Sequence, residues 1–256
     1  MKKLLKLFLI GAIYSQVSLA NAVMPVSEII QKAEKAAYYQ GEDGVAKVDM
    51  QMSDGQSRQF VILRKNFKEN QKFFVYFKRP SDVMKTTFLV HKFKEQDDDR
   101  WMYLPSLDLV KRIASGDKRT SFVGSNFYYE DVSGRNPSDD EHFLEGEEDG
   151  AYIIKSVPKD KDKVEFAYFK TWIDKNTFIP KKAEYFDAAG KNYRRYMAQN
   201  IEDKQGFKTV TQSVMEDLNS GEKTNLSYSE VKYNVGLPED IFTERFLKNP
   251  PKKWLE

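Results

Sequence analysis

Apolar and polar residues alternate along most of the chain, which is the pattern of strands that bury one face and expose the other. Val48, Met50 and Met52 alternate with two polar residues, and a Ser-Asp-Gly turn follows them. Comparable runs stand at 60–63, 73–77, 86–93, 151–157, 163–173, 179–187, 192–200, 207–217 and 223–233. Most connections are short, whereas parallel strands need crossovers of about a dozen residues or more. The pattern therefore predicts consecutive antiparallel hairpins.

Three segments have a helical spacing instead. Between Ser27 and Gly41, apolar residues recur every three or four positions, so we expect a helix that Ser27 caps and Gly41 ends. Residues 138–144 and residues 238–247 each predict a further short helix. A sheet of about ten strands tends to curl or close. The fold class we expect is mainly β (α+β): a strongly curved antiparallel sheet of about ten strands forms an unclosed β-barrel, and a few helices plug its open side.

The first 22 residues have the three parts of a secretory signal peptide. Three lysines come first, then an apolar stretch from Leu7 to Ile13, then an Ala-Asn-Ala cleavage site that ends at Ala22. The apolar stretch is shorter than the roughly 20 residues that span a bilayer. We therefore expect residues 1–22 to be cleaved and residues 23–256 to form a single domain in the periplasm. The chain has no cysteine, so we expect no lipid anchor and no disulfide.

The net charge argues against a nucleic-acid partner. The whole chain carries +2 at neutral pH. Because the signal segment holds three lysines and no acidic residue, the exported part has a net charge of −1. A protein of this charge lacks the excess of basic residues on which nucleic-acid binding depends.

The sequence shows no motif of catalysis or metal binding. It has no cysteine and no G-x-S-x-G motif, and its two histidines, His91 and His142, have no metal-ligand spacing. The acidic runs of the chain lack the spacing of a calcium loop. Glu130 and Asp131 are adjacent, so on a strand their side chains would point to opposite faces. We expect a protein that is not an enzyme and that binds no cofactor or metal.

Aromatic residues are abundant, with 18 Phe, 14 Tyr and 3 Trp. Most aromatic residues on strands fill cores. Together with methionine they also make adaptable apolar walls, which suit flexible acyl chains. The residues that we expect to line such a cavity or its rim are Met50, Met52, Phe60, Ile62, Phe74, Tyr76, Phe88, Trp101, Tyr103, Phe127 and Tyr129. A place in an ordinary core is the alternative for each of them.

Residues 101–131 carry the most specific motif. W-x-Y-L-P begins at Trp101, a basic pair precedes Ile113, and S-F-x-G-S-x-F-x-Y-E-D runs from Ser121 to Asp131. Less specific matches extend to D-I-F-T at 240–243. This combination resembles bacterial outer-membrane lipoprotein-sorting proteins of the LolA-like superfamily. More narrowly, it is similar to an uncharacterised branch that is associated with RND/MMPL-type exporters.

The resemblance implies a LolA/LolB-like unclosed β-barrel whose hydrophobic cavity holds acyl chains. The expected function is a periplasmic carrier of a lipoprotein or another lipid towards the outer membrane, with only peripheral or transient membrane contact. For residues 100–132 we expect a strand, a loop turned by proline and a second strand. The basic residues of the loop that would contact headgroups or a membrane partner are Lys111, Arg112, Lys118 and Arg119. The alternative function is a non-enzymatic adaptor of an inner-membrane RND/MMPL-type exporter.

Overall fold

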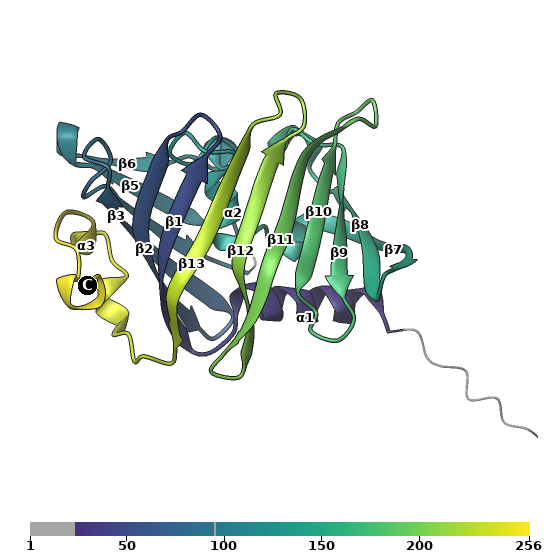
Figure 1. The fold of residues 1–256 in the computed structure, drawn as a ribbon, viewed down its shortest axis with the longest axis horizontal. Helices are drawn as coiled ribbons and strands as arrows, with labels where there is room; N and C mark the ends of the chain where they lie inside the picture. The colour runs from purple at the N-terminus through teal and green to yellow at the C-terminus, as the bar shows by residue number, and fades with distance from the viewer. Residues whose placement is uncertain (1–23, 95) are drawn as a thin grey trace, which may run out of the picture.

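The computed structural model describes residues 24–94 and 96–256, and the predicted signal segment lies outside them. In this part of the chain thirteen strands form one antiparallel sheet (Figure 1). The strands are β1 (Asp43–Met52), β2 (Ser57–Phe67), β3 (Asn70–Arg79), β4 (Thr87–Lys92), β5 (Asp99–Leu104), β6 (Leu109–Ile113), β7 (Asp140–Glu148), β8 (Ala151–Pro158), β9 (Tyr168–Asp174), β10 (Pro180–Phe186), β11 (Asn192–Lys204), β12 (Phe207–Asp217) and β13 (Lys223–Tyr233). The α-helices among these residues are α1 (Val26–Tyr38), α2 (Tyr129–Ser133) and α3 (Arg245–Lys248).

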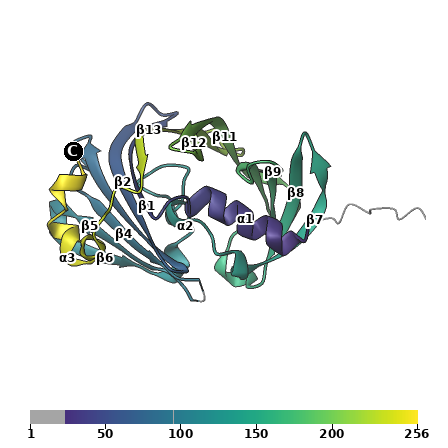
Figure 2. The same cartoon turned by 90° about the horizontal axis from the view of Figure 1, so that it is seen from below.

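The first and last strands meet in the middle of the sheet. The strand order is β6-β5-β4-β3-β2-β1-β13-β12-β11-β10-β9-β8-β7, so β6 and β7 are the two free edges. We call β1–β6 the first half and β7–β13 the second half. The sheet curls between its edges without closing, and α1 lies across its open side (Figure 2). The predicted curved, unclosed antiparallel sheet is thus confirmed.

The concave face of the first half is filled by aromatic and methionine side chains. Phe60 and Phe77 lie on neighbouring strands with ring centroids 5.1 Å apart. Phe122, from the loop before α2, packs on Phe77 with the two ring centroids 5.8 Å apart. Phe127 and Tyr129 join the same cluster, so residues 114–133 plug this part of the half-barrel.

The convex face of the first half is covered as well. The C-terminal segment 234–256, which includes α3, packs on Leu63, Phe74 and Leu89. Phe242 of this segment is fully buried. His91 on β4 contacts the Phe242 carbonyl oxygen through its Nε2 at 2.8 Å, which fixes the segment on the sheet. The central strands of the first half are therefore apolar on both faces, as strands buried on both sides usually are.

The convex face of the second half carries cross-strand charges instead. Glu184 on β10 lies 3.2 Å from Arg195 on β11 and 3.6 Å from Lys182. Lys182 stands 3.4 Å from the ring centroid of Trp172 on β9. Alternating charges of this kind are typical of an antiparallel sheet with one solvated face.

Four predictions about the elements are wrong. Ser27 does not cap α1, because the helix already begins at Val26 after Pro25 and no side chain caps it. The sheet has thirteen strands rather than about ten: β5 is the first strand expected for residues 100–132, and β6 and β7 lie outside the predicted runs. Residues 138–144 do not form a capped helix, because all but the first two belong to β7, which pairs with β8. The second strand of the 100–132 region is β6, and the predicted strand at Phe127–Tyr129 is a loop that leads into α2.

Candidate functional site

A cavity of about 430 Å³ lies between α1 and the concave face of the sheet. Its volume falls within the range of about 300–1,000 Å³ that is usual for small-molecule sites. Both halves of the sheet contribute to it, from β1–β3 and from β7–β13. The apolar and aromatic residues that line it are Ile30, Ala33, Ala36, Ala37, Tyr38, Val45, Ala46, Met50, Phe60, Ile62, Phe73, Val75, Phe122, Phe127, Val132, Phe169, Ile173, Ile179, Ala183, Tyr185, Val210, Tyr196, Met215, Leu226, Tyr228, Val231 and Tyr233.

The helix α1 forms one wall of the cavity and is held at both ends. Near its start, Ile29 and Ala33 pack on Ile154 and Ile173 of the second half. At its other end, the Tyr38 ring leaves no space for a side chain at Gly134, where an added Cβ would meet ring atoms at 2.5–3.0 Å. Gly134 has a φ of 76°, which also favours glycine. The helix thus joins the two halves of the sheet across the open side.

Ion pairing adds to this attachment. Glu34 of α1 lies 3.6 Å from the Nζ of Lys92, a lysine on β4 that is only 1% exposed. The Lys92 Nζ also donates to the Ser133 carbonyl oxygen at the end of α2. One buried cation therefore connects α1, α2 and the first half of the sheet.

Tyrosines contribute rings rather than charge to the cavity wall. Burial raises the pKa of Tyr196 to about 12. Burial likewise raises the pKa of Tyr38, Tyr185 and Tyr228. At neutral pH their phenols are therefore protonated, and these parts of the wall carry no charge. Such a wall can pack against a hydrocarbon chain and still offer single hydroxyl groups.

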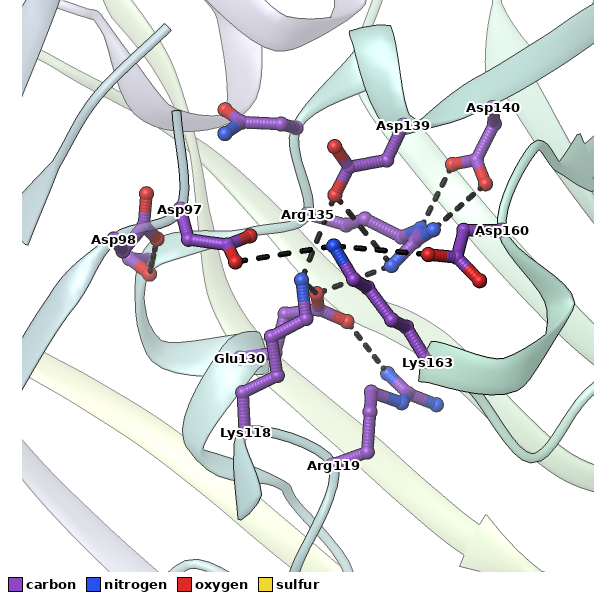
Figure 3. Close-up of polar contacts among 12 residues, drawn as sticks. Asp97, Asp98, Lys118, Arg119, Glu130, Arg135, Asp139, Asp140, Asp160 and Lys163 are labelled. Carbon is purple, nitrogen blue, oxygen red and sulfur yellow. Dashed lines mark hydrogen bonds and ion pairs between the residues drawn. The ribbon is translucent and has the colours of Figure 1, made fainter. Parts of the chain in front are cut away.

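Beside the cavity lies a buried set of ion pairs around Glu130, which we call the Glu130 network (Figure 3). The Glu130 side chain is only 2% exposed, and its carboxylate lies 3.2 Å from the Lys118 Nζ, 3.1 Å from Arg119 and 3.2 Å from Arg135. Burial acts to raise the pKa of Glu130, but the charges of these three cations prevail and hold the pKa below its ordinary value. Glu130 therefore stays ionised.

The network extends to the second half of the sheet. Arg135 donates to both carboxylate oxygens of Asp140 at 2.8 and 2.9 Å, and Arg119 donates to Glu165 at 2.6 Å. Arg194 of β11 pairs with Asp131 of α2. Each of these arginines thus meets at least one carboxylate. The network fastens the plug of residues 114–133 to β7 and β11, and this role is structural.

Another stretch of the cavity wall carries basic side chains that have fewer carboxylate partners than those of the Glu130 network. We call it the Arg64 mouth; its residues are Gln40, Gly44, Arg64, Lys208, Lys232 and Tyr233. Lys208 and Lys232 are exposed, so this end of the cavity reaches solvent. Arg64 is half-buried on β2, and burial lowers its pKa.

The structure brings four of the predicted cavity residues to the cavity: Met50, Phe60, Ile62 and Phe127. Phe88 and Tyr129 lie in the adjoining concave-face cluster. Met52 is buried at the end of β1, two residues beyond Met50, and does not line the cavity.

The remaining four predicted cavity residues are on the wrong face. Phe74, Tyr76, Trp101 and Tyr103 belong to the convex-face cluster under the C-terminal segment. On β3 the partner of Ile62 is Val75, so Phe73, Val75 and Phe77 face the concave side. Both faces of this half are buried, so the apolar run 73–77 gives no sign of its register. A shift of one residue exchanges the two faces.

The predicted headgroup contacts separate into two pairs. Lys111 and Arg112 are exposed on the edge strand β6, where Arg112 pairs with Asp99. Lys118 and Arg119 are instead buried in the Glu130 network and are not available to a headgroup, which corrects the prediction for these two. Cations that lose their water need carboxylate partners, and Glu130 supplies one.

The second half contributes a part of the cavity wall whose residues were not predicted from the sequence. Ala183 and Tyr185 alternate on β10, Ser213 and Met215 on β12, and Leu226 and Tyr228 on β13; all six line the cavity. This alternation is visible in the sequence and was a usable signal for these residues.

The two histidines have structural partners. The Nδ1 of His142 contacts the Ser156 hydroxyl at 2.8 Å, and its Nε2 contacts the Pro137 carbonyl oxygen at 2.9 Å. Burial lowers the pKa of His91, which contacts Phe242. Within residues 24–94 and 96–256, no group of three His, Cys, Asp or Glu side chains is placed to hold a metal ion. Over the same residues, no helix has the length and apolar composition to cross a membrane.

Comparisons with known proteins agree with this fold. A family model described as "Uncharacterized protein" matches residues 69–249. A DUF1329 family protein from Desulfovibrio piger is 28% identical, with a TM-score of 0.80 over 88% of this chain and 100% of that one. A putative outer membrane lipoprotein-sorting protein domain from Vibrio parahaemolyticus is 27% identical, with a TM-score of 0.78 over 86% of this chain and 97% of that one.

A third solved structure shares the fold at lower identity. The LolA superfamily protein from Nitrosomonas europaea is 21% identical, with a TM-score of 0.67 over 88% of this chain and 100% of that one. A search of curated proteins found no match. The predicted LolA-like fold is therefore confirmed.

Proposed function

This chain belongs to the family whose model matches residues 69–249, its fold is LolA-like, and from that premise we propose that it is a periplasmic carrier, not an enzyme, whose cavity holds an acyl chain. The cargo is a lipoprotein or another lipid on its way to the outer membrane. The observation that carries the proposal is the cavity of about 430 Å³ between α1 and the concave face.

The physical reason is the cost of exposing hydrocarbon to water. Each buried CH₂ group contributes about 0.8 kcal/mol, so an acyl chain crosses an aqueous compartment only inside an apolar container. Met50, Phe60 and Ile62 offer apolar wall on one side, and Tyr196 and Tyr228 offer uncharged rings on another. Methionine and aromatic side chains adapt well to flexible chains.

The similarity to a protein described as lipoprotein-sorting supports the same class of cargo. Export to the periplasm rests on the signal peptide predicted for residues 1–22. The family relationship and the cavity are independent of that segment.

The proposal is tested by filling the cavity without burying a charge. Ala183 lines the cavity on β10, so Ala183→Trp puts an indole into the space that an acyl chain would occupy. The matched control is Ala189→Trp in the exposed turn between β10 and β11. Binding is followed by the fluorescence of an acyl probe that brightens in apolar surroundings.

We expect Ala183→Trp to lose most probe binding, while Ala189→Trp binds like the unmodified protein. Circular dichroism checks that both variants are folded. If folded Ala183→Trp bound the probe as well as the control did, the cavity would not be the binding site.

An adaptor role on an RND/MMPL-type exporter stays a prediction. The Ala183→Trp variant separates it from the carrier role, because an adaptor would still capture the transporter after its cavity is filled.

A further inference from the structure

We propose that the Arg64 mouth is a binding site for the anionic head of a single-chain amphiphile, with a carboxylate or a phosphate on the end of one acyl chain. This inference rests on the carrier function proposed above and adds the chemistry of the cargo's head. It concerns the cavity wall at Gln40, Gly44, Arg64, Lys208, Lys232 and Tyr233.

Arg64 differs from the buried arginines in its partners. It donates to the Asn66 Oδ1 at 3.0 Å and to the Gln40 carbonyl oxygen, and its guanidinium lies 6.0 Å from the Tyr233 ring centroid. Among the described residues no carboxylate oxygen comes within 4.0 Å of it. The arginines with buried side chains each have a carboxylate oxygen within 4.0 Å; they are Arg58, Arg100, Arg119, Arg135 and Arg194.

The nearest candidate carboxylate is occupied. Asp43 on β1 is 2% exposed and accepts from the backbone N–H groups of Val235 and Leu237 at 2.7 and 2.6 Å. Lys65 lies 3.8 Å from the same carboxylate. Asp43 therefore holds the C-terminal segment; its charge acts on Arg64 from beyond 4.0 Å, but the two side chains form no ion pair.

Carboxylates elsewhere on the cavity wall are also paired. Glu34 pairs with Lys92, Asp131 with Arg194, and Asp140 with Arg135. Lys208 has an exposed partner in Asp203 at 3.3 Å, so the charge that lacks a carboxylate belongs to Arg64 and to Lys232. The cavity wall thus carries an excess of positive charge, and this excess lies at the end of the cavity that opens to solvent.

Gly44 leaves room for a ligand at this place. It pairs with Arg64 on β2 and with Tyr233 on β13. An added Cβ there would lie 3.1 Å from the Lys232 carbonyl oxygen and 3.6 Å from the Arg64 Nη2. The approach to the carbonyl oxygen is tight and that to the guanidinium is an ordinary van der Waals contact, so a side chain longer than a Cβ would take up space beside Arg64 that glycine leaves open to the cavity.

The sequence of β2 also fits an amphiphile. Arg64, Ile62 and Phe60 all line the cavity at alternate positions of one strand. Successive side chains on one face of a strand are about 6.6–6.8 Å apart, so a head at Arg64 places its hydrocarbon along Ile62 and Phe60. A guanidinium can hold a carboxylate or a phosphate through two parallel hydrogen bonds. Burial lowers the pKa of Arg64, and an anion beside it would offset that effect.

Calorimetric titration of the whole protein with three probes tests the inference. The probes are palmitate, 1-palmitoyl lysophosphatidic acid and hexadecanol, which share a C16 chain and differ in the head. We expect both anions to bind about tenfold tighter than the alcohol, as one charge-assisted contact of a guanidinium allows. Whichever anion binds tighter identifies the head as carboxylate or phosphate.

The variant is Arg64→Gln, and the matched control is Arg245→Gln, an exposed arginine of α3 on the convex side of the sheet. Arg64→Gln should lower the affinity for both anions about tenfold and leave that for hexadecanol unchanged, while Arg245→Gln should change none of them. Arg64→Lys should keep part of the preference for anions, which separates loss of charge from loss of folding.

The inference is overturned if the unmodified protein binds hexadecanol as tightly as palmitate, or if Arg64→Gln weakens all three probes alike. The second result would mean that Arg64 only caps the end of α1 through the Gln40 carbonyl. Both results leave the carrier function intact. If the unmodified protein bound none of the probes, the carrier function itself would fail.

Discussion

The Glu130 network and the Arg64 mouth are two charged regions beside one cavity, and their arginines have different partners. Arg135 in the network meets Asp140 through two hydrogen bonds and also contacts Glu130. Arg64 at the mouth meets only a backbone carbonyl oxygen, an amide oxygen and an aromatic ring. Positive charge is thus balanced within the protein in the first region and left over in the second.

The difference separates a structural role from a binding role. A buried ion pair stabilises little relative to an apolar pair, but removing one partner costs several kcal/mol because the other charge is left without compensation. The Glu130 network therefore resists change and holds the plug in place. A half-buried cation that reaches solvent tolerates the absence of a partner and is ready to accept one from a ligand.

The largest expected effect comes from the network. Glu130→Gln removes the shared partner of Lys118, Arg119 and Arg135, so the free energy of unfolding should fall by about 3–5 kcal/mol. Urea denaturation followed by circular dichroism measures it. The control is Glu69→Gln, where the exposed pair with Lys94 should contribute little. Equal effects of the two substitutions would show that the network is not what holds the plug.

The contribution of Glu130 to the free energy of unfolding should depend on pH. The pKa of folded Glu130 lies below its ordinary value of 4.5, so its ionised form stabilises the fold at any pH above that value. The contribution is lost as the pH falls through the folded pKa, where the carboxylate takes up a proton. The difference in unfolding free energy between the protein and Glu130→Gln should therefore be constant near neutrality and shrink below pH 4.5. A difference that grows on acidification would contradict this.

Ligand binding should stabilise the protein by a smaller amount. Palmitate at about a hundred times its Kd should raise the free energy of unfolding by about 2.7 kcal/mol. The midpoint of thermal unfolding rises accordingly. The gain should vanish in Ala183→Trp, whose cavity is filled, and should persist in Ala189→Trp.

The smallest expected effect is that of Arg64→Gln on the protein without ligand. The substitution removes the hydrogen bond to the Gln40 carbonyl and leaves no carboxylate without a partner, so about 1 kcal/mol of stability should be lost. The measurement is the same urea denaturation. A loss as large as that of Glu130→Gln would place Arg64 among the structural arginines and remove the contrast between the two regions.

The sequence predicted the second half of the sheet better than the first. The bounds of β12 and β13 were predicted to the residue, because apolar alternation and an Asn-Ser-Gly turn delimit them. In the β5–β6 hairpin the first strand and its proline turn were predicted, but the second strand was expected near Phe127 and lies instead directly after the turn, at Leu109–Ile113. Residues 138–144 carry helix-start residues, yet pairing with β8 makes most of them a strand.

The candidate site was only partly predictable. Met50 follows from the alternation of apolar and polar residues along β1, whereas β2 is apolar on both faces at Phe60–Leu63. Phe74 was placed on the wrong face because the C-terminal segment buries the convex side, and nothing in the local sequence announces that contact. Arg64 could not be singled out either, since its distinction is the absence of a nearby carboxylate and not a motif.

Native mass spectrometry of the protein isolated from its host tests the central claim most directly. The account predicts a bound acyl amphiphile with an anionic head, lost in Ala183→Trp and retained in Ala189→Trp. A protein that is consistently empty, or an adduct that persists when the cavity is filled, would contradict it.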